Sequence, residues 1–216
     1  MVARIGRGQA SPLRVNEDSL LSNLVRQRAQ AFLNVIARGL GAMGLTPNML
    51  TLIGFFAMCG IGVVLALGNF ALGGALIIAA GIFDALDGSL ARLTNRVTQF
   101  GAFLDSTTDR FAEGAVYLGI MYWYLQRGMV FVAYLIFFTL LGSLMVSYAR
   151  ARAEGIGVEM KEGLMTRFER IALLVIGLLL TAAFGDAPIL IVLAILAVFT
   201  NVTAVQRMWL VYRATR

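Results

Sequence analysis

The chain has 216 residues, of which 59% are hydrophobic and only 14% are charged, and its mean hydropathy is +0.81. About a quarter of the residues of a soluble domain are charged, so this composition excludes an ordinary soluble protein and predicts an integral membrane protein. The apolar runs are about 20 residues long, which suits helices that cross a core of ~30 Å rather than the short alternating strands of a barrel. The predicted fold class is therefore all-α.

Histidine is absent, and there is a single cysteine, Cys59. These counts exclude an intrachain disulfide, thiol-rich metal sites and every mechanism that needs histidine, including the Ser-His-Asp triad and His-ligated zinc. The pI of ≈ 10.1 follows from arginines gathered on one side of a membrane and from contact with anionic lipids. Nucleic acid is therefore not needed as a partner.

The beginning of the chain is polar. Residues 1–18 are rich in arginine and have no apolar core, so we expect a flexible cytoplasmic tail rather than a signal peptide. Residues 19–43 mix leucines with arginines in a pattern that predicts an amphipathic helix lying in the membrane interface; a soluble packing helix is the alternative. Residues 19–216 are predicted to form one membrane domain, made of this helix and six spans at about 48–68, 70–94, 99–126, 129–153, 168–185 and 187–212.

The placement of arginine orients these spans. Arginines are frequent in the first 43 residues, in the second-to-third and fourth-to-fifth connections and at the C-terminus, whereas Arg127 stands alone on the other side. Positive residues in short loops favour the cytoplasmic side of a membrane. Both termini are therefore expected in the cytoplasm.

Four aspartates interrupt the second and third spans. Asp84 and Asp87 share one helix face with Gly88, and Asp105 and Asp109 lie at i and i+4 on the next helix. Such charges repel one another near a membrane unless they are paired or hold cations. Oxygen ligands without histidine or cysteine indicate Mg²⁺ or Mn²⁺, and four carboxylates can balance two such ions. The alternative is a set of aspartates paired with neighbouring arginines.

The segment from Asp84 to Asp109 matches, without a gap, the DxxDGxxAR(x8)GxxxDxxxD signature of the CDP-alcohol phosphotransferase family. The chain resembles this family over roughly residues 19–212, including its six-helix layout with an interfacial N-terminal helix. The resemblance implies that Asp84 and Asp105 bridge two Mg²⁺ ions, that Asp87 completes the first site, and that Asp109 serves the second site and acts as the catalytic base.

The resemblance also implies which residues bind the CDP-linked lipid. They lie in the signature, in the loop before Gly101 and in a second matching stretch, TPNM, and they are Thr46, Pro47, Asn48, Met49, Gly88, Arg92 and Thr98. Many relatives have aspartate in place of Asn48. The TPN sequence also predicts the start of a helix, with Thr46 as the cap and Pro47 in the first turn.

A second basic segment, "SYARARAEGIGVEMKEGLMTRFER", lies between the fourth and fifth spans. Its ARAE and TRFER sequences resemble the pocket of the bacterial phosphatidylinositol phosphate synthases that receives the phosphate of the acceptor; those relatives often have ERPER, so Thr166 and Phe168 are departures. A solvated positive-inside loop is the alternative. The predicted acceptor-phosphate ligands are Arg150, Arg152, Arg167, Arg170 and, near the end of the last span, Arg207.

These features predict an enzyme that transfers the phosphatidyl group of CDP-diacylglycerol to a phosphorylated polyol, inositol phosphate, and releases CMP. Glycerol 3-phosphate is the alternative acceptor, because phosphatidylglycerophosphate synthases share the signature. A divalent-cation transporter is an alternative of another class, but these carboxylates cluster at one side of the membrane rather than near its midplane. The family habit and the glycine-rich packing also predict a homodimer, in a prokaryotic cell membrane and with its active site on the cytoplasmic side.

Overall fold

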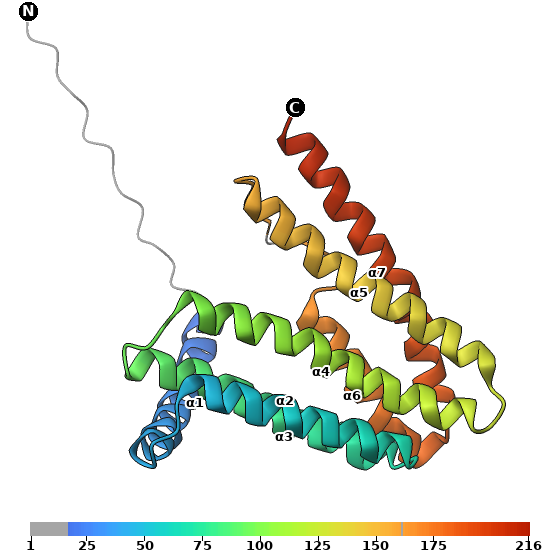
Figure 1. The fold of residues 1–216 in the computed structure, drawn as a ribbon, viewed down its shortest axis with the longest axis horizontal. Helices are drawn as coiled ribbons and strands as arrows, with labels where there is room; N and C mark the ends of the chain where they lie inside the picture. The colour runs from blue at the N-terminus through green and yellow to red at the C-terminus, as the bar shows by residue number, and fades with distance from the viewer. Residues whose placement is uncertain (1–16, 161) are drawn as a thin grey trace, which may run out of the picture.

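The computed structural model describes residues 17–160 and 162–216, and in these residues it contains seven α-helices and no strand (Figure 1). In chain order the helices are α1 (Glu17–Ala42), α2 (Pro47–Ala66), α3 (Phe70–Leu93), α4 (Gln99–Leu125), α5 (Val130–Gly155), α6 (Arg167–Phe184) and α7 (Ala187–Ala214). The all-α prediction is confirmed for this part of the chain. The tail predicted for residues 1–18 lies outside the described residues, except for its last two, which begin α1.

Four of the described helices, α2, α3, α5 and α7, are long and apolar enough to cross a membrane. The other two predicted spans differ in composition. Helix α4 contains Asp105, Asp109, Arg110 and Glu113, and the 18-residue α6 begins with Arg-Phe-Glu-Arg. Charged residues are expensive inside a bilayer, so by length and composition four helices qualify as spans, and the predicted six spans are not confirmed. Helix α1 covers the residues of the predicted interfacial helix, and its place at an interface stays a prediction.

Helix α2 is the centre of the N-terminal half, since it packs against both α3 and α4. Helices α5 and α7 pack along each other, and α6 lies against α3 and α7 (Figure 1). Helix α1 contacts the end of α3, where buried Ala37, Leu50, Leu86 and Leu90 form a small separate core. Helices α3 and α4 make little direct contact with each other, and both pack against α2. A space therefore lies between α3 and α4, with α2 at its base.

Glycines allow two of these helix pairs to approach closely. A Cβ atom on Gly119 of α4 would lie 2.0 Å from the carbonyl oxygen of Gly62 on α2, and one on Gly142 of α5 would lie 2.2 Å from Thr200 Oγ1 on α7. No side chain fits at either position. Small residues at helix contacts are typical of membrane bundles, where close backbone packing replaces the hydrophobic effect as the source of association.

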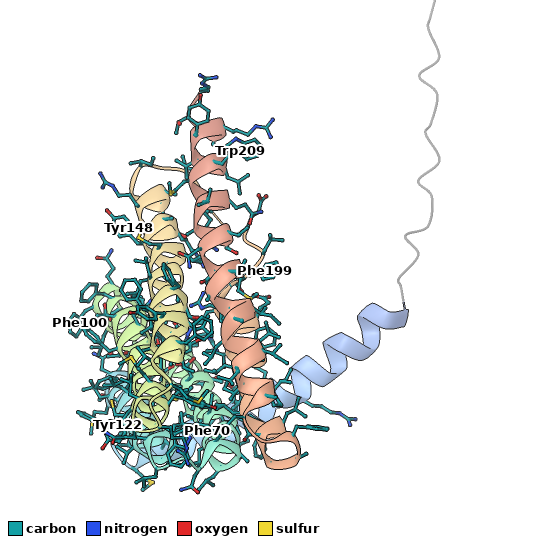
Figure 2. All side chains as sticks on the ribbon, turned by 90° about the vertical axis from the view of Figure 1, so that its right-hand side faces the viewer. Phe70, Phe100, Tyr122, Tyr148, Phe199 and Trp209 are labelled. Atoms are coloured by element: carbon teal, nitrogen blue, oxygen red, sulfur yellow. The ribbon has the colours of Figure 1, made fainter. Side chains whose placement is uncertain are left out.

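The outside of the bundle is apolar. Phe100, Tyr148 and Trp209 all point outward in Figure 2, and each is more than half exposed, whereas Phe70 is 4% exposed and packs against Trp123 and Tyr124. A continuous exposed surface of this kind suits contact with lipid. Asp87, Arg170 and Arg207, in contrast, are buried inside the bundle.

Candidate active site

Three of the four signature aspartates come together between α3 and α4. Asp84 of α3 and Asp105 and Asp109 of α4 each place a carboxylate oxygen within 4.8 Å of the other two. Asp109 and Asp105 are partly buried, whereas Asp84 is exposed toward the opening. We call these three residues the acidic cluster. The two helices bring the carboxylates together across a gap because both of them pack against α2.

The acidic cluster fits a divalent metal ion. Mg²⁺ holds its oxygen ligands at about 2.0–2.1 Å in an octahedron, so oxygens around one ion are roughly 3–4 Å apart. The spacing of the three carboxylates is close to this range, and none of the cluster members offers nitrogen or sulfur. Hard oxygen donors of this kind favour Mg²⁺ and Mn²⁺.

Asp87, the fourth signature aspartate, faces α2. Its Oδ2 accepts a hydrogen bond of 2.8 Å from Thr51 Oγ1, and its side chain is buried. It still lines the same cavity as Asp84 and Asp109. The structure therefore joins three of the predicted metal ligands directly and holds the fourth beside them through a hydroxyl of α2.

Arg167, the first residue of α6, lies across the acidic cluster. Its Nη2 is 2.6 Å from Asp109 Oδ1, and its Nη1 is 3.3 Å from Asp84 Oδ2. Arg110 approaches Asp109 Oδ2 from α4 itself, at 3.6 Å. The guanidinium of Arg167 therefore lies where a phosphate that approaches the carboxylates would meet it.

A cavity of about 530 Å³ opens beside these charges. Helices α2, α3, α4 and α6 all contribute to it, and Asp84, Asp87, Asp109 and Arg167 form its polar end. The apolar part is lined by Leu50, Phe55, Met58, Ile77, Ile78, Phe168, Ile171 and Val175. A cavity that joins a charged end to an apolar interior suits a ligand with a phosphate and a hydrocarbon part.

The first turns of α2 and α4 meet near the cluster. Thr46 caps α2 by accepting a hydrogen bond of 3.3 Å from the Met49 N–H, and Pro47 opens the helix, which confirms the predicted helix start. Thr98 caps α4 in the same way through the N–H of Gly101, at 3.0 Å. A Cβ atom on Gly101 would lie 3.2 Å from Asn48 Oδ1, so the two helix starts touch at this glycine.

Gly88 and Arg92 lie on α3 after Asp87. The only atoms within 4 Å of a Cβ built on Gly88 are the guanidinium nitrogens of Arg92, and Arg92 is exposed. Arg92 Nη2 also donates to Ser89 Oγ at 3.4 Å. The side of α3 next to the aspartates is therefore open, and the Arg92 guanidinium lies beside it.

The other predicted acceptor ligands are more varied. Arg170 is 2% exposed and pairs with Glu113 of α4, while Arg207 is 3% exposed and donates to the carbonyl oxygens of Val146 and Glu162. Exposed Arg150 pairs with Glu154 at 2.8 Å, and Arg152 lies in the last turn of α5. Arg167 alone among the predicted five lines the cavity described above.

Sequence reasoning missed two residues of this neighbourhood, Thr51 and Glu113. Glu113 continues the spacing of Asp105 and Asp109 by four residues along α4, so the same periodicity could have identified it. Thr51 had no comparable signal, because a threonine in an apolar run usually bonds its own helix backbone. Its contact with Asp87 spans 36 positions of sequence and becomes visible only in the fold.

Curated relatives of known name match most of the chain. The archaetidylinositol phosphate synthase of Methanothermobacter thermautotrophicus is 37% identical over 202 residues, which cover 90% of this chain and 96% of the relative. The phosphatidylinositol phosphate synthase of Mycobacteroides abscessus is 34% identical over 192 residues, and the match covers 86% of each chain.

The fold has a similar match. The crystal structure of Mycobacterium tuberculosis phosphatidylinositol phosphate synthase with CDP-DAG bound superposes with a TM-score of 0.79 at 31% identity, covering 83% of this chain and 93% of that one. A second structure of that enzyme, in complex with manganese and citrate, gives a TM-score of 0.77. The family model described as CDP-alcohol phosphatidyltransferase matches residues 44–209. With its signature aspartates gathered beside an amphipathic cavity, the chain belongs to the CDP-alcohol phosphatidyltransferase family.

Proposed function

We propose that this protein transfers the phosphatidyl group of CDP-diacylglycerol to inositol phosphate, giving phosphatidylinositol phosphate and CMP. The observation that carries the proposal is the acidic cluster at the polar end of the apolar cavity. A lipid joined to a nucleotide by pyrophosphate needs both parts of such a site. Relatives from archaea and from bacteria are both named as inositol phosphate synthases, which supports the choice of inositol phosphate as the acceptor.

The reaction in this proposal is an in-line displacement at phosphorus. The hydroxyl oxygen of the acceptor forms a bond to the lipid-side phosphorus, and the bond from that phosphorus to the bridging oxygen breaks, so CMP leaves with the electron pair. Asp109 accepts the proton of the hydroxyl as general base. Its carboxylate lies at the polar end of the cavity, which supports this assignment.

Asp84, Asp87, Asp105 and Asp109 would hold two divalent ions, Mg²⁺ or Mn²⁺. Such ions, when bound, neutralise the charge of the pyrophosphate and of the departing CMP. The residues Thr46, Pro47, Asn48, Met49, Thr98, Gly88 and Arg92 would bind the nucleotide part of the donor. Their position at the helix starts and on the open side of α3 supports this assignment.

Arg167 is the main ligand for the acceptor phosphate in this proposal, since it lines the cavity and lies beside the proposed base. Arg150, Arg152, Arg170 and Arg207 are assigned secondary roles at the acceptor site, since none of them lines the cavity and Arg150 and Arg170 are each paired with a glutamate. A guanidinium makes two parallel hydrogen bonds to a phosphate, which gives it geometric as well as electrostatic selectivity.

The site is proposed to open at the cytoplasmic face of a prokaryotic cell membrane. Helices α4 and α6 complete six spans in this arrangement. The charged residues of α6 lie in its first turn, Asp105, Asp109 and Arg110 lie in the half of α4 that begins at the site, and the charge of Glu113, at the middle of α4, is paired with Arg170. Arg92, Arg96, Arg150 and Arg207 lie at these same helix ends, whereas Arg127 lies at the other end of the bundle, as the positive-inside rule requires. A homodimer remains a prediction from the family.

The proposal is tested by CMP release from purified protein with Mg²⁺, CDP-diacylglycerol and a panel of acceptors. We expect inositol phosphate to give turnover, with free inositol a poor acceptor. A preference for glycerol 3-phosphate would contradict the assignment of inositol phosphate as the acceptor, but it would leave the proposed phosphatidyl transfer unchanged. Absence of CMP release with every acceptor would contradict the proposal.

A second donor has specific support. The relative from Methanothermobacter, named for an archaetidyl lipid, is as similar to this chain as the mycobacterial phosphatidyl enzymes are. The acceptor assay therefore needs a parallel arm with a CDP-linked archaeal ether lipid. Faster turnover with the ether lipid would identify it as the preferred donor, and the assignment of the acceptor would stay the same.

A further inference from the structure

Two ion pairs join α4 to α6 side by side. Asp109 and Glu113 lie four residues apart on one face of α4, and Arg167 and Arg170 lie three residues apart on one face of α6. Arg167 Nη2 is 2.6 Å from Asp109 Oδ1, and Arg170 Nε is 3.0 Å from Glu113 Oε1. The helices therefore meet through two ion pairs in register, one helical turn apart.

Both carboxylate oxygens of Glu113 accept hydrogen bonds from other groups of the protein. Its Oε1 accepts from Ser143 Oγ of α5 at 2.7 Å and from Arg170 Nε, and its Oε2 accepts from Arg170 Nη2 at 3.1 Å. The Arg170 side chain is 2% exposed and that of Glu113 is 13% exposed, so this two-pronged pair is largely shielded from water. A buried bidentate pair fixes the geometry of its two helices more firmly than an exposed pair does.

This pair matters for position because α4 and α6 do not pack closely along their backbones. Helix α6 packs on α3 and α7, and α4 packs on α2 and α5. Arg167 is the first residue of α6, so the place of its guanidinium depends on where the first turn lies. Arg170 follows one turn later on the same face, and its contact with Glu113 ties that turn to α4.

We propose that Glu113 is a positioning residue: through Arg170 it holds the start of α6 against α4, and so it keeps Arg167 at the acidic cluster. The inference rests on the proposed function, since it takes the Arg167 guanidinium to bind the phosphate of the acceptor. Glu113 contacts neither substrate in this arrangement and acts only through the arginines.

Two other roles of the pair predict different kinetics. If Arg170 bound the acceptor phosphate itself, loss of Glu113 would weaken acceptor binding whether or not Arg167 is present. If the pair only stabilised the fold, its loss would lower the melting temperature and the yield of active enzyme. The acceptor KM of the folded enzyme would then stay at its parental value.

The test measures the KM for inositol phosphate, by CMP release at saturating CDP-diacylglycerol, for Glu113→Gln and Ser143→Ala. Each substitution is made in the parent and in an Arg167→Ala background. In the parent we expect Glu113→Gln to raise this KM about 10-fold and Ser143→Ala about 3-fold, with the KM for CDP-diacylglycerol unchanged. In the Arg167→Ala background neither substitution should raise it further, because the group that they position is gone.

Asp186→Asn is the matched control, since it makes the same kind of change at the exposed turn that follows the far end of α6. Ser143→Ala removes one hydroxyl and keeps the measurement possible if Glu113→Gln does not fold. An acceptor KM that stays parental in both variants, or that rises equally in both backgrounds, overturns the inference. Failure of the proposed function is distinguishable, because it appears as absent turnover in the parent protein itself.

Discussion

Thr51 of α2 donates a hydrogen bond of 2.8 Å to Asp87 Oδ2 of α3. Helices α3 and α4 both pack against α2. The hydrogen bond therefore ties an aspartate of the signature to the helix that supports both sides of the site. Asp87 is buried, and a buried carboxylate needs such a donor to hold one orientation. Thr51 therefore orients Asp87 toward the cavity.

Replacing Thr51 with valine keeps the shape of the side chain and removes the donor. A hydrogen bond to a charged group is worth about 1.5–3 kcal/mol, so we expect Thr51→Val to lower kcat/KM for CMP release roughly 10- to 100-fold. Thr51→Ser keeps the hydroxyl and should stay close to the parent. Equal activity of the valine and serine variants would show that the bond has no functional role.

Asp84→Asn and Asp105→Asn should each bring turnover down to the background of the assay. An amide is a much poorer ligand than a carboxylate for a hard cation, and each residue is proposed to contact both ions. Titration with Mn²⁺, followed by the paramagnetic signal of the free ion, measures the metal directly. Near-parental activity and metal binding in either variant would contradict the two-ion proposal.

Asp109→Asn separates the base from the metal ligands. We expect the chemical step to slow by ~10²–10⁴-fold, as is typical for loss of a general base, while CDP-diacylglycerol still binds. Single-turnover CMP release and an equilibrium binding measurement with the labelled donor give the two quantities. Loss of donor binding together with turnover would indicate that Asp109 is chiefly a ligand.

Arg167 is expected to distinguish phosphorylated from free acceptors. Arg167→Ala should raise the KM for inositol phosphate roughly 10- to 100-fold, because a charge-assisted contact worth about 1.5–3 kcal/mol is lost. Arg167→Lys should recover only part of this, since an ammonium cannot make the two-pronged contact. Kinetics with free inositol provide the control, and a similar loss with that acceptor would exclude a role in phosphate binding.

The contact between α2 and α4 predicts a difference between two glycines of α4. Gly119→Ala would place a methyl group 2.0 Å from the Gly62 carbonyl oxygen, whereas no atom lies within 4 Å of a Cβ on Gly114. Overpacking costs about 1–3 kcal/mol, so Gly119→Ala should lower the melting temperature in detergent. Gly114→Ala should be neutral or slightly stabilising, because alanine is favoured over glycine by ~1 kcal/mol in a helix. Equal melting temperatures would contradict this packing.

The sequence alone determined several features that depend on local pattern. Long apolar runs predicted helices, the TPN sequence predicted the start of α2, and the spacing of Asp105 and Asp109 predicted one carboxylate face. These features depend on residues a few positions apart, for which helix periodicity and capping fix the geometry. The family resemblance over the signature segment is confirmed by the match to residues 44–209.

The tertiary structure alone decided which charges meet. The sequence placed Arg167 and Arg170 in one group of five predicted phosphate ligands. In the fold Arg167 reaches Asp84, 83 positions away, whereas Arg170 is buried against Glu113, 57 positions away. Helix periodicity determines which side chains share a face of one helix. It does not determine which face of another helix packs against them. That choice follows from the packing of α3 and α4 on α2, and of α6 on α3 and α7, which sets the partners of each charged residue.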